Sequence, residues 1–294
     1  MVLDVLAREK GLEVAASARG RGLVGAAKAA YPAVAWRELN AETASVSEIG
    51  EVIAGANYVV SCIGLIKHRF DEADPAGVER AIAVNALFPQ RLGRAAQASG
   101  ARVLQIATDC VYSGARGAYV ETDPHDALDV YGKTKSLGEC RGRAVSSLRC
   151  SIVGAELEGG PSLLEWFLAQ PRGARLNGFT NHRWNGVTTL HFGKICAGII
   201  KNSLETGPLR HIVPGDSATK HELLSLFARV YGRGDVAIAP VPAPTAVDRT
   251  LATADPRANA ELWKAAGYDA PPSIALMVSE LAAYKILLAK AVKS

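Results

Sequence analysis

Tyr131 and Lys135 are the two residues whose types and spacing most clearly suggest chemistry. They lie four positions apart in the segment VYGKTK, and side chains at that spacing on a helix lie about one turn apart on the same face. A phenol has an ordinary pKa of about 10, and a neighbouring ammonium lowers that pKa because it favours the phenolate. Such a pair can give a proton to a carbonyl that is being reduced, or take one from an alcohol that is being oxidised.

Thr108 and Asp109 follow the apolar run that precedes this segment. Residues 103–106 read VLQI, which is typical of a buried strand. Open α/β sheets bind their ligands at the carboxyl ends of their strands, so the hydroxyl of Thr108 would reach the same substrate oxygen as Tyr131. The Tyr-x-x-x-Lys spacing alone is also typical of an ordinary surface helix, and it arises often by chance. The order of strand, Thr-Asp, glycine-containing loop and helix favours a catalytic cluster.

Residues 108–139 resemble the extended short-chain dehydrogenase/reductases. Within them the segment is most similar to the dTDP-4-dehydrorhamnose reductases and related reductases of nucleotide-activated sugars. The stretches that carry the resemblance are TDCVYSG at 108–114, YVETDP at 119–124, VYGKTK at 130–135 and GE at 138–139. Cys110 stands where the family often has an aromatic residue, and this difference affects the shape of the substrate pocket.

This resemblance implies NADPH-dependent reduction of a nucleotide-linked 4-keto-6-deoxy sugar in polysaccharide precursor synthesis. It implies that Tyr131 delivers the proton and that Lys135 lowers the phenol pKa and holds the nicotinamide ribose. Thr108 would orient the carbonyl, so the expected substrate contacts are Thr108, Asp109 and Tyr131. The cofactor carries the hydride chemistry and the protein supplies placement.

Basic residues after the second expected strand indicate which dinucleotide is bound. Arg19 and Arg21 follow residues 13–17. At this place an acidic residue accepts the ribose hydroxyls of NAD, whereas an arginine suits the 2′-phosphate of NADP. A solvated basic turn explains Arg21 equally well. We therefore expect NADPH as the cofactor, with NADH as the alternative.

Further cofactor contacts are expected where buried segments end. Residues 56–64 (ANYVVSCIG) form an apolar run closed by glycine, which is typical of a strand whose backbone approaches a ligand. Asn85 lies within an expected helix at 78–99, and asparagine at such a position favours a hydrogen-bonding role. Arg149-Cys150-Ser151 resembles the Arg-Thr-Ser that the family has beside the nicotinamide. The expected cofactor-binding residues are Arg19, Cys62, Ile63, Gly64, Asn85, Tyr131, Lys135 and Arg149.

The expected fold is α/β: a Rossmann-like, doubly wound parallel sheet with a smaller α+β C-terminal substrate domain. Residues 1–10 indicate an amphipathic helix, whereas a dinucleotide-binding fold opens with a strand and a Gly-rich turn. Neither G-x-G-x-x-G nor G-x-x-G-x-x-G precedes this helix. We therefore expect the first strand and its Gly-rich loop to be missing, which leaves two strand edges facing a gap. The two explanations are a sequence that begins at an internal methionine and a true variant that closes the sheet differently.

The dinucleotide-binding domain is expected over residues 1–153, with a helix at 187–202 returning to it. The composition changes after residue 153, so residues 154–294 are expected to form mainly the smaller substrate-binding domain. Within it, residues 173–185 are expected to be irregular. The sequence shows no repeat and no flexible linker, so the two parts are expected to pack directly together.

The composition limits the classes of protein to which this chain can belong. The chain has 294 residues, a formal net charge of +4 and 49% hydrophobic residues, which are ordinary values for a soluble globular protein. No apolar run approaches the roughly 20 residues that a membrane span needs, and the scattered basic residues do not indicate nucleic acid binding. The five cysteines show no C-x-x-C and the six histidines show no metal-ligand spacing. We therefore expect reduced thiols, a cytoplasmic location and no metal. The expected partner is a nucleotide-activated sugar, and a homodimer is compatible with the sequence.

Two other functions are alternatives to the predicted reductase. An NAD-dependent nucleotide-sugar epimerase or dehydratase is the first, but dehydratases usually carry an acidic pair after the threonine, and here Asp109 is followed by Cys110. A non-catalytic, dinucleotide-binding regulatory subunit is the second. The presence of Thr108, Tyr131 and Lys135 argues against it, and the absent glycine loop argues for it.

Overall fold

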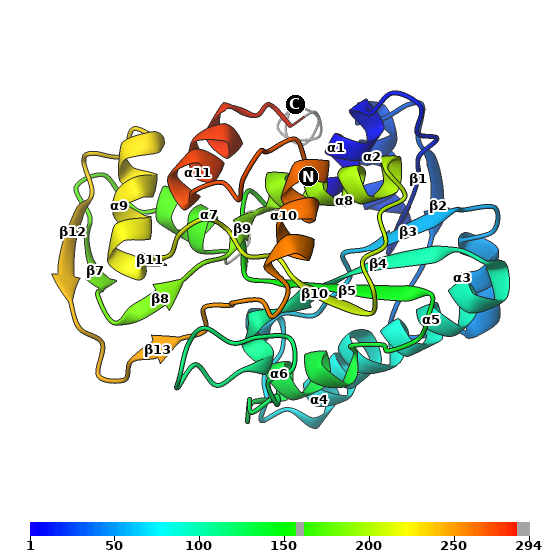
Figure 1. Ribbon diagram of the computed structural model, residues 1–294, viewed down its shortest axis with the longest axis horizontal. Coiled ribbons are helices and arrows are strands. Elements are labelled where there is room, and N and C mark those ends of the chain that lie inside the picture. The colour runs from blue at the N-terminus through cyan, green and yellow to red at the C-terminus, as the bar shows by residue number, and fades with distance from the viewer. Residues whose placement is uncertain (157–161, 287–294) are drawn as a thin grey trace.

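The structure of the chain is a computed structural model that describes residues 1–156 and 162–286 (Figure 1). The side chains of residues 21–24 and 26 lie outside this description. Strands and helices coloured blue to green form the larger part on the right of the view, and a smaller part with α9 and β12 lies on the left.

Four parallel strands form the main sheet in the order β10-β5-β4-β3. They are β3 (Tyr58–Ser61), β4 (Arg102–Thr108), β5 (Val145–Cys150) and β10 (Leu209–His211). Val103 and Leu104, adjacent on the central strand β4, are both buried but belong to different hydrophobic clusters, because successive side chains of a strand point to opposite faces. A sheet that is buried on both faces is typical of parallel α/β proteins. The predicted Rossmann-like α/β class is confirmed.

Helices cover both faces of this sheet. On the face of Val103 lie α3 (Val46–Val52) and α5 (Phe88–Ser99), and on the face of Leu104 lies α8 (Thr189–Lys201). Ser45 begins α3 with a capping box, in which Ser45 and Glu48 each accept a backbone N–H of the other. The remaining helical segments of this part are α1 (Val2–Arg8), α2 (Arg21–Ala30), η1 (Lys67–Arg69), α4 (Pro75–Ile82), η2 (Ala83–Leu87), η3 (Asp109–Val111) and α6 (Val130–Leu137).

The parallel sheet of the larger part is divided. The strands β1 (Ala15–Ala18) and β2 (Ala35–Glu38) form a separate parallel pair. Within residues 1–156 and 162–286 no strand bridges β1 and β3. This is the division expected when the place of the central strand of a doubly wound sheet is empty.

The smaller part is built from short strands and three helices. The strand pairs are β6 (Ile152–Val153) with β9 (Val187–Thr188), β7 (Arg175–Phe179) with β12 (Ala237–Val241), and β8 (His182–Trp184) with both β11 (Ala218–Thr219) and β13 (Val247–Asp248). The helices are α7 (Leu163–Leu168), α9 (Lys220–Val230) and α11 (Ile274–Ala283), while α10 (Pro256–Ala265) packs against α8. After α8 the chain returns to the main sheet, because β10 pairs with β5.

The prediction that residues 173–185 are irregular was wrong, because β7 and β8 lie there. The strand β7 carries Asn177-Gly178, residues that favour turns, and its partner β12 lies about 60 residues further along the chain. Long-range pairing therefore overrides the local preference.

One hydrophobic core joins the two parts. Leu104 and Leu148 of the main sheet share a buried cluster with Phe192, Trp263 and Met277 from the later helices. The expected direct packing of the two parts is confirmed. None of the helices in the described ranges is long and apolar enough to cross a membrane.

Candidate active site

The end of β4 and the start of α6 bring the predicted catalytic residues together. Thr108 is the last residue of β4, and α6 begins at Val130. Asp129 is the N-cap of α6: its Oδ1 accepts the backbone N–H of Gly132 at 2.8 Å. This cap fixes the first turn of the helix, which carries Tyr131, one turn before Lys135.

Tyr131 is half-buried, and the hydroxyl of Thr108 faces its phenol. The backbone N–H of Cys110 donates to Thr108 Oγ1 at 3.1 Å and so fixes the position of that hydroxyl. Burial raises the pKa of Tyr131, and the interaction with Thr108 only partly offsets this. The expected lowering of this pKa by Lys135 was therefore wrong, because the cost of desolvating a phenolate dominates. A raised pKa keeps Tyr131 protonated, which is the form that donates a proton.

Lys135 lies in a buried position beside Gly64 and Asn85. Its Nζ donates to the backbone oxygen of Ile106 at 3.3 Å. A Cβ atom added to Gly64 would lie 3.7 Å from Lys135 Nζ and 3.6 Å from Asn85 Oδ1. Burial lowers the pKa of Lys135, and the carboxylate of Glu139 opposes this shift. An ammonium has three N–H donors, and the described residues accept one of them. The two others fit the hydroxyl groups of a nicotinamide ribose.

Asn85 connects the segment after β3 to α6 by hydrogen bonds. Its Oδ1 accepts the N–H of Leu65 at 2.8 Å, and its Nδ2 donates to Leu65 O at 2.9 Å and to Thr134 Oγ1 at 3.3 Å. The residue lies in η2, a π-helical turn between α4 and α5. Such wide turns occur frequently at functional sites. The predicted helix at 78–99 is therefore interrupted, and Asn85 positions Leu65, next to Gly64.

Gly138 allows α6 to end against this π-helical turn. A Cβ atom at Gly138 would lie 1.9 Å from the backbone oxygen of Asn85. We expect Gly138→Ala to lower the free energy of unfolding by about 1–3 kcal/mol and to reduce activity, because α6 must move away from η2. Urea denaturation measures the loss. Gly50→Ala is the matched control, since nothing lies within 4 Å of its added Cβ; an equal loss in both variants would contradict the prediction.

The other predicted cofactor residues lie at different places. Cys62 is exposed at the end of β3, and Ile63 packs against the core beside α3 and α5. Arg19 lies on the surface after β1, where its Nη1 forms a 2.9 Å ion pair with Glu42. Glu42 also pairs with Arg80 at 3.2 Å. The side chain of Arg21 lies outside the described residues. The site thus has one cluster around Tyr131 and one separate basic group at Arg19.

Arg149 was predicted to contact the cofactor, but its guanidinium is held in a buried network of protein groups. Its side chain is fully buried, and all five guanidinium N–H groups have protein acceptors. Nε and Nη2 donate to Glu139 at 3.0 and 2.5 Å. Nη1 donates to the hydroxyl of Tyr112 at 2.6 Å and to Nε2 of His211 at 2.7 Å. Nη2 also donates to Nε2 of His125 at 2.7 Å. No N–H is left for a ligand.

The two histidines at Arg149 are held in their neutral form. Each accepts a guanidinium N–H at Nε2, so the remaining hydrogen lies on Nδ1; that of His211 donates to the backbone oxygen of Ala252 at 2.7 Å. Burial lowers the pKa of both His125 and His211, and the charge of Arg149 adds to the effect. Sequence reasoning missed both residues, because their partner Arg149 is distant in the chain.

These histidines predict an acid-sensitive fold. Because their pKa is lower in the folded protein than the ordinary value of about 6.5, the unfolded chain binds more protons below that pH. The free energy of unfolding should therefore fall as the pH drops below about 6.5. Urea denaturation between pH 7.5 and pH 5 measures this, with His125→Gln and His211→Gln as variants in which an amide oxygen can accept from Arg149. An identical pH dependence of the wild type and the double variant would contradict the prediction.

Lys67 and Arg249 are two further cations at the site that the sequence did not indicate. Lys67 Nζ lies 2.8 Å from Asp129 Oδ2 and 6.0 Å from the centroid of the Tyr131 ring. Arg249 Nε donates to the backbone oxygen of Tyr112 at 2.8 Å, and its charge acts on Asp109. Both come from segments far from β4 in the sequence. Cations and carboxylates therefore lie side by side around Tyr131, and the charges of Asp109 and Asp129 add to the rise of its pKa.

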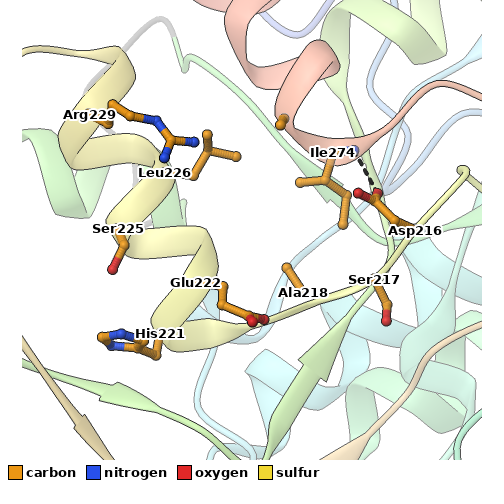
Figure 2. Close-up of a pocket in the computed structure, with 10 residues that line it drawn as sticks. Asp216, Ser217, Ala218, His221, Glu222, Ser225, Leu226, Arg229 and Ile274 are labelled. Carbon is orange, nitrogen blue, oxygen red and sulfur yellow. Dashed lines mark hydrogen bonds between the residues drawn. The ribbon is translucent and has the colours of Figure 1, made fainter.

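Two cavities lie away from this cluster. One, of about 350 Å³, lies between α9 and α11 (Figure 2). Arg229, Ser225 and His221 lie along α9 on one side, and Asp216 on the opposite side accepts the backbone N–H of Ile274 at 2.7 Å. The other, of about 640 Å³, lies beside His125 and Glu139. Neither cavity is lined by Thr108, Tyr131 or Lys135. The candidate site therefore rests on the types and positions of these three side chains.

The chain is similar in sequence to dTDP-4-dehydrorhamnose reductases, and similar in fold to several nucleotide-sugar enzymes. Residues 11–153 match the protein family described as RmlD substrate binding domain. A dTDP-4-dehydrorhamnose reductase of Streptomyces griseus is 40% identical over 82 residues, which are 28% of this chain and 26% of that protein. This chain thus matches about a quarter of the length of that curated relative. The predicted resemblance to dTDP-4-dehydrorhamnose reductases is confirmed.

Solved structures agree in fold. A dTDP-4-dehydrorhamnose reductase from Clostridium acetobutylicum is 18% identical, with a TM-score of 0.68 over 92% of this chain and 98% of the other. The enzyme of the same name from Bacillus anthracis, in complex with NADP, is 18% identical, with a TM-score of 0.67 over 84% and 89% of the two chains. A UDP-glucuronic acid 4-epimerase from Bacillus cereus, in complex with NAD, is 12% identical, with a TM-score of 0.71 over 96% and 94%. At these identities the likeness shows the fold alone.

Proposed function

We propose that this chain is an NADPH-dependent reductase of a nucleotide-linked 4-keto-6-deoxy sugar that serves polysaccharide precursor synthesis. The observation that carries the proposal is the cluster of Tyr131, Thr108 and Lys135 at one edge of a parallel sheet, with a buried ammonium that has spare donors. The match of residues 11–153 to the RmlD substrate binding domain supports the substrate class.

Each residue of the cluster has a separate task in this proposal. Tyr131 donates its proton to the oxygen of the sugar ketone, and Thr108 holds that oxygen by a hydrogen bond. Lys135 binds the ribose next to the nicotinamide through its free N–H groups. The bound dinucleotide supplies the hydride. The protein orients the two reactants, and this placement lowers the barrier by removing their freedom to move apart.

The proposed activity is tested with the purified chain, NADPH and dTDP-4-keto-6-deoxy sugars, by following the loss of NADPH absorbance and the sugar product. Net oxidation of NADPH with formation of a 4-hydroxy sugar supports the reductase. An epimerised or dehydrated product without net consumption of the cofactor would replace it by the epimerase or dehydratase alternative. Binding of dinucleotide without any turnover would favour the regulatory subunit.

Arg19 tests the preference for NADPH. We expect Arg19→Gln to weaken NADPH binding by about tenfold or more, because a charge-assisted hydrogen bond is worth about 1.5–3 kcal/mol, and to leave NADH binding nearly unchanged. Fluorescence titration of both dinucleotides measures this. Arg80→Gln is the matched control, since Arg80 shares the partner Glu42 but does not follow β1. Equal losses for NADPH and NADH would refute the contact with the 2′-phosphate.

The cysteines accord with a reducing compartment. All five, Cys62, Cys110, Cys140, Cys150 and Cys196, are free thiols. We propose a cytoplasmic location on this ground, because disulfides are rare in the cytosol.

A further inference from the structure

The segment that follows β3 runs along the side of α6 that carries the predicted catalytic pair. At its start, a Cβ atom added to Gly64 would lie 3.7 Å from Nζ of Lys135. Three residues later, Nζ of Lys67 lies 6.0 Å from the centroid of the Tyr131 ring. Lys135 and Tyr131 are about one helical turn apart. Residues 64–67, the wall segment, therefore span that turn and form one side of the site.

The wall segment is attached to the helices at two points. Asn85 holds Leu65 by two hydrogen bonds, because its Oδ1 accepts the N–H of Leu65 at 2.8 Å and its Nδ2 donates to Leu65 O at 2.9 Å. Lys67 Nζ donates to Oδ2 of Asp129 at 2.8 Å. The first attachment joins the wall segment to η2, and the second joins it to the start of α6. The second is the one that reaches the helix turn of Tyr131.

Asp129 belongs to both the wall contact and the helix. Its Oδ1 accepts the N–H of Gly132 and caps α6, while its Oδ2 accepts from Lys67. The same turn approaches the end of β4 closely, since a Cβ atom added to Gly132 would lie 2.5 Å from the backbone oxygen of Cys110. The cap and this close approach fix the turn that carries Tyr131. Lys67 then ties the wall segment to a fixed turn.

The exposure of this ion pair limits what it can contribute. The side chains of Lys67 and Asp129 are 39% and 28% exposed, and partly exposed ion pairs add little to the stability of the whole fold. Placement in a reaction site is more demanding, because a displacement of about 1 Å can cost about 10²-fold in rate. The pair is therefore better suited to placing the wall segment than to holding the fold together.

We propose that Lys67 is a positioning residue whose ion pair with Asp129 holds the wall segment against the turn of α6 that carries Tyr131. The pair thereby sets the distance between the cofactor side of the wall segment, at Gly64, and the proton donor. Lys67 acts through the wall segment and does not touch the reacting atoms. This assignment deepens the proposed reductase function and rests on it.

Hydrogen exchange tests the attachment without turnover. We expect Lys67→Met to speed the exchange of the backbone amides of the wall segment by about two- to fivefold in the full chain, because loss of a partly exposed ion pair favours local opening by a factor of this size. Lys67→Arg keeps the cation and should exchange at the rate of the wild type. Lys133→Met, at an exposed position of α6, is the control and should also leave the exchange unchanged. Equal exchange in Lys67→Met and the wild type would overturn the proposal, whatever the enzyme reduces.

Asp129→Asn separates the ion pair from the helix cap. Asparagine caps a helix as well as aspartate does, so its oxygen can still accept the N–H of Gly132. Its amide N–H groups then face Lys67, and one donor cannot accept from another. We expect the same gain in exchange as in Lys67→Met, with a shift of the urea midpoint below about 0.5 M. A larger shift in both variants would show that the pair holds the fold, and the positioning role would be refuted.

Kinetics with NADPH and the keto sugar distinguish positioning from substrate binding. We expect Lys67→Met and Asp129→Asn each to lower kcat by about three- to tenfold, because both release the same wall segment. The double variant should show no further loss, since the two residues act as one unit. Additive losses would overturn the proposal.

A direct contact between Lys67 and the substrate gives a different pattern. In that case Lys67→Met raises the KM for the sugar and leaves kcat nearly unchanged, while Asp129→Asn does neither, and the proposal fails. If no nucleotide sugar is reduced at all, the proposed function fails, while hydrogen exchange still decides whether Lys67 attaches the wall segment to α6.

Discussion

Tyr131→Phe should lower kcat by about 10²–10⁴-fold, because removing the phenolic hydroxyl removes the proton donor, and general acid catalysis contributes a factor of this size. The aromatic ring remains and still packs at the start of α6. We therefore expect the dissociation constant for NADPH to change by less than about threefold. Single-turnover kinetics with NADPH and the keto sugar, together with fluorescence titration of the cofactor, measure both effects.

The control for this variant is Tyr231→Phe, at the end of α9. Tyr231 packs in the core against Phe227, and none of the described residues forms a hydrogen bond with its hydroxyl. This variant should keep both kcat and cofactor affinity. If Tyr131→Phe retained the turnover of the wild type, Tyr131 would be removed from the mechanism, and the proposed reductase would lose its acid.

Arg149→Met should lower the free energy of unfolding by about 3–5 kcal/mol. Its removal leaves the carboxylate of Glu139 buried without its counter-ion, since that side chain is 11% exposed. The hydroxyl of Tyr112 and the Nε2 atoms of His125 and His211 lose their donor as well. Urea denaturation at pH 7.5 measures the loss.

Two further variants test whether the loss of stability comes from the buried charge of Glu139. Adding Glu139→Gln to Arg149→Met should restore part of the stability, because the orphaned charge is gone. Lys201→Met removes a surface ion pair to Glu9 at 2.7 Å, and it should cost about 1 kcal/mol or less. A loss for Arg149→Met no greater than that for Lys201→Met would show that the buried network contributes little.

The local pattern was sufficient to predict that Thr108 ends a strand and that Tyr131 and Lys135 share one helix. The Tyr131 and Lys135 spacing depends on one helix, and the N-cap Asp129 and strand end Thr108 lie close to it in the sequence. Local spacing of this kind predicts the relative positions of side chains, because a helix and a strand end have fixed geometries. The parallel α/β class followed in the same way from apolar runs such as β3 and β4.

The features of the site that the sequence did not predict depend on contacts between distant segments. Arg149 is matched to His125, Tyr112 and His211, and no spacing rule connects these positions. The pKa of Tyr131 is governed by burial, which local sequence does not determine. The π-helical turn at Asn85 lies where Gly138, more than 50 residues further along the chain, approaches closely. Each of these features is tertiary in origin.

The division of the parallel sheet affects how the protein unfolds. The strands β1 and β2 share no backbone ladder with β3, and the small cluster of Ala27, Tyr31 and Val34 beside them is distinct from the main core. Cooperativity is carried by shared hydrogen bonds and shared burial. The segment from β1 to β2 is therefore expected to open as an independent foldon, at a lower energetic threshold than the strands that present Thr108.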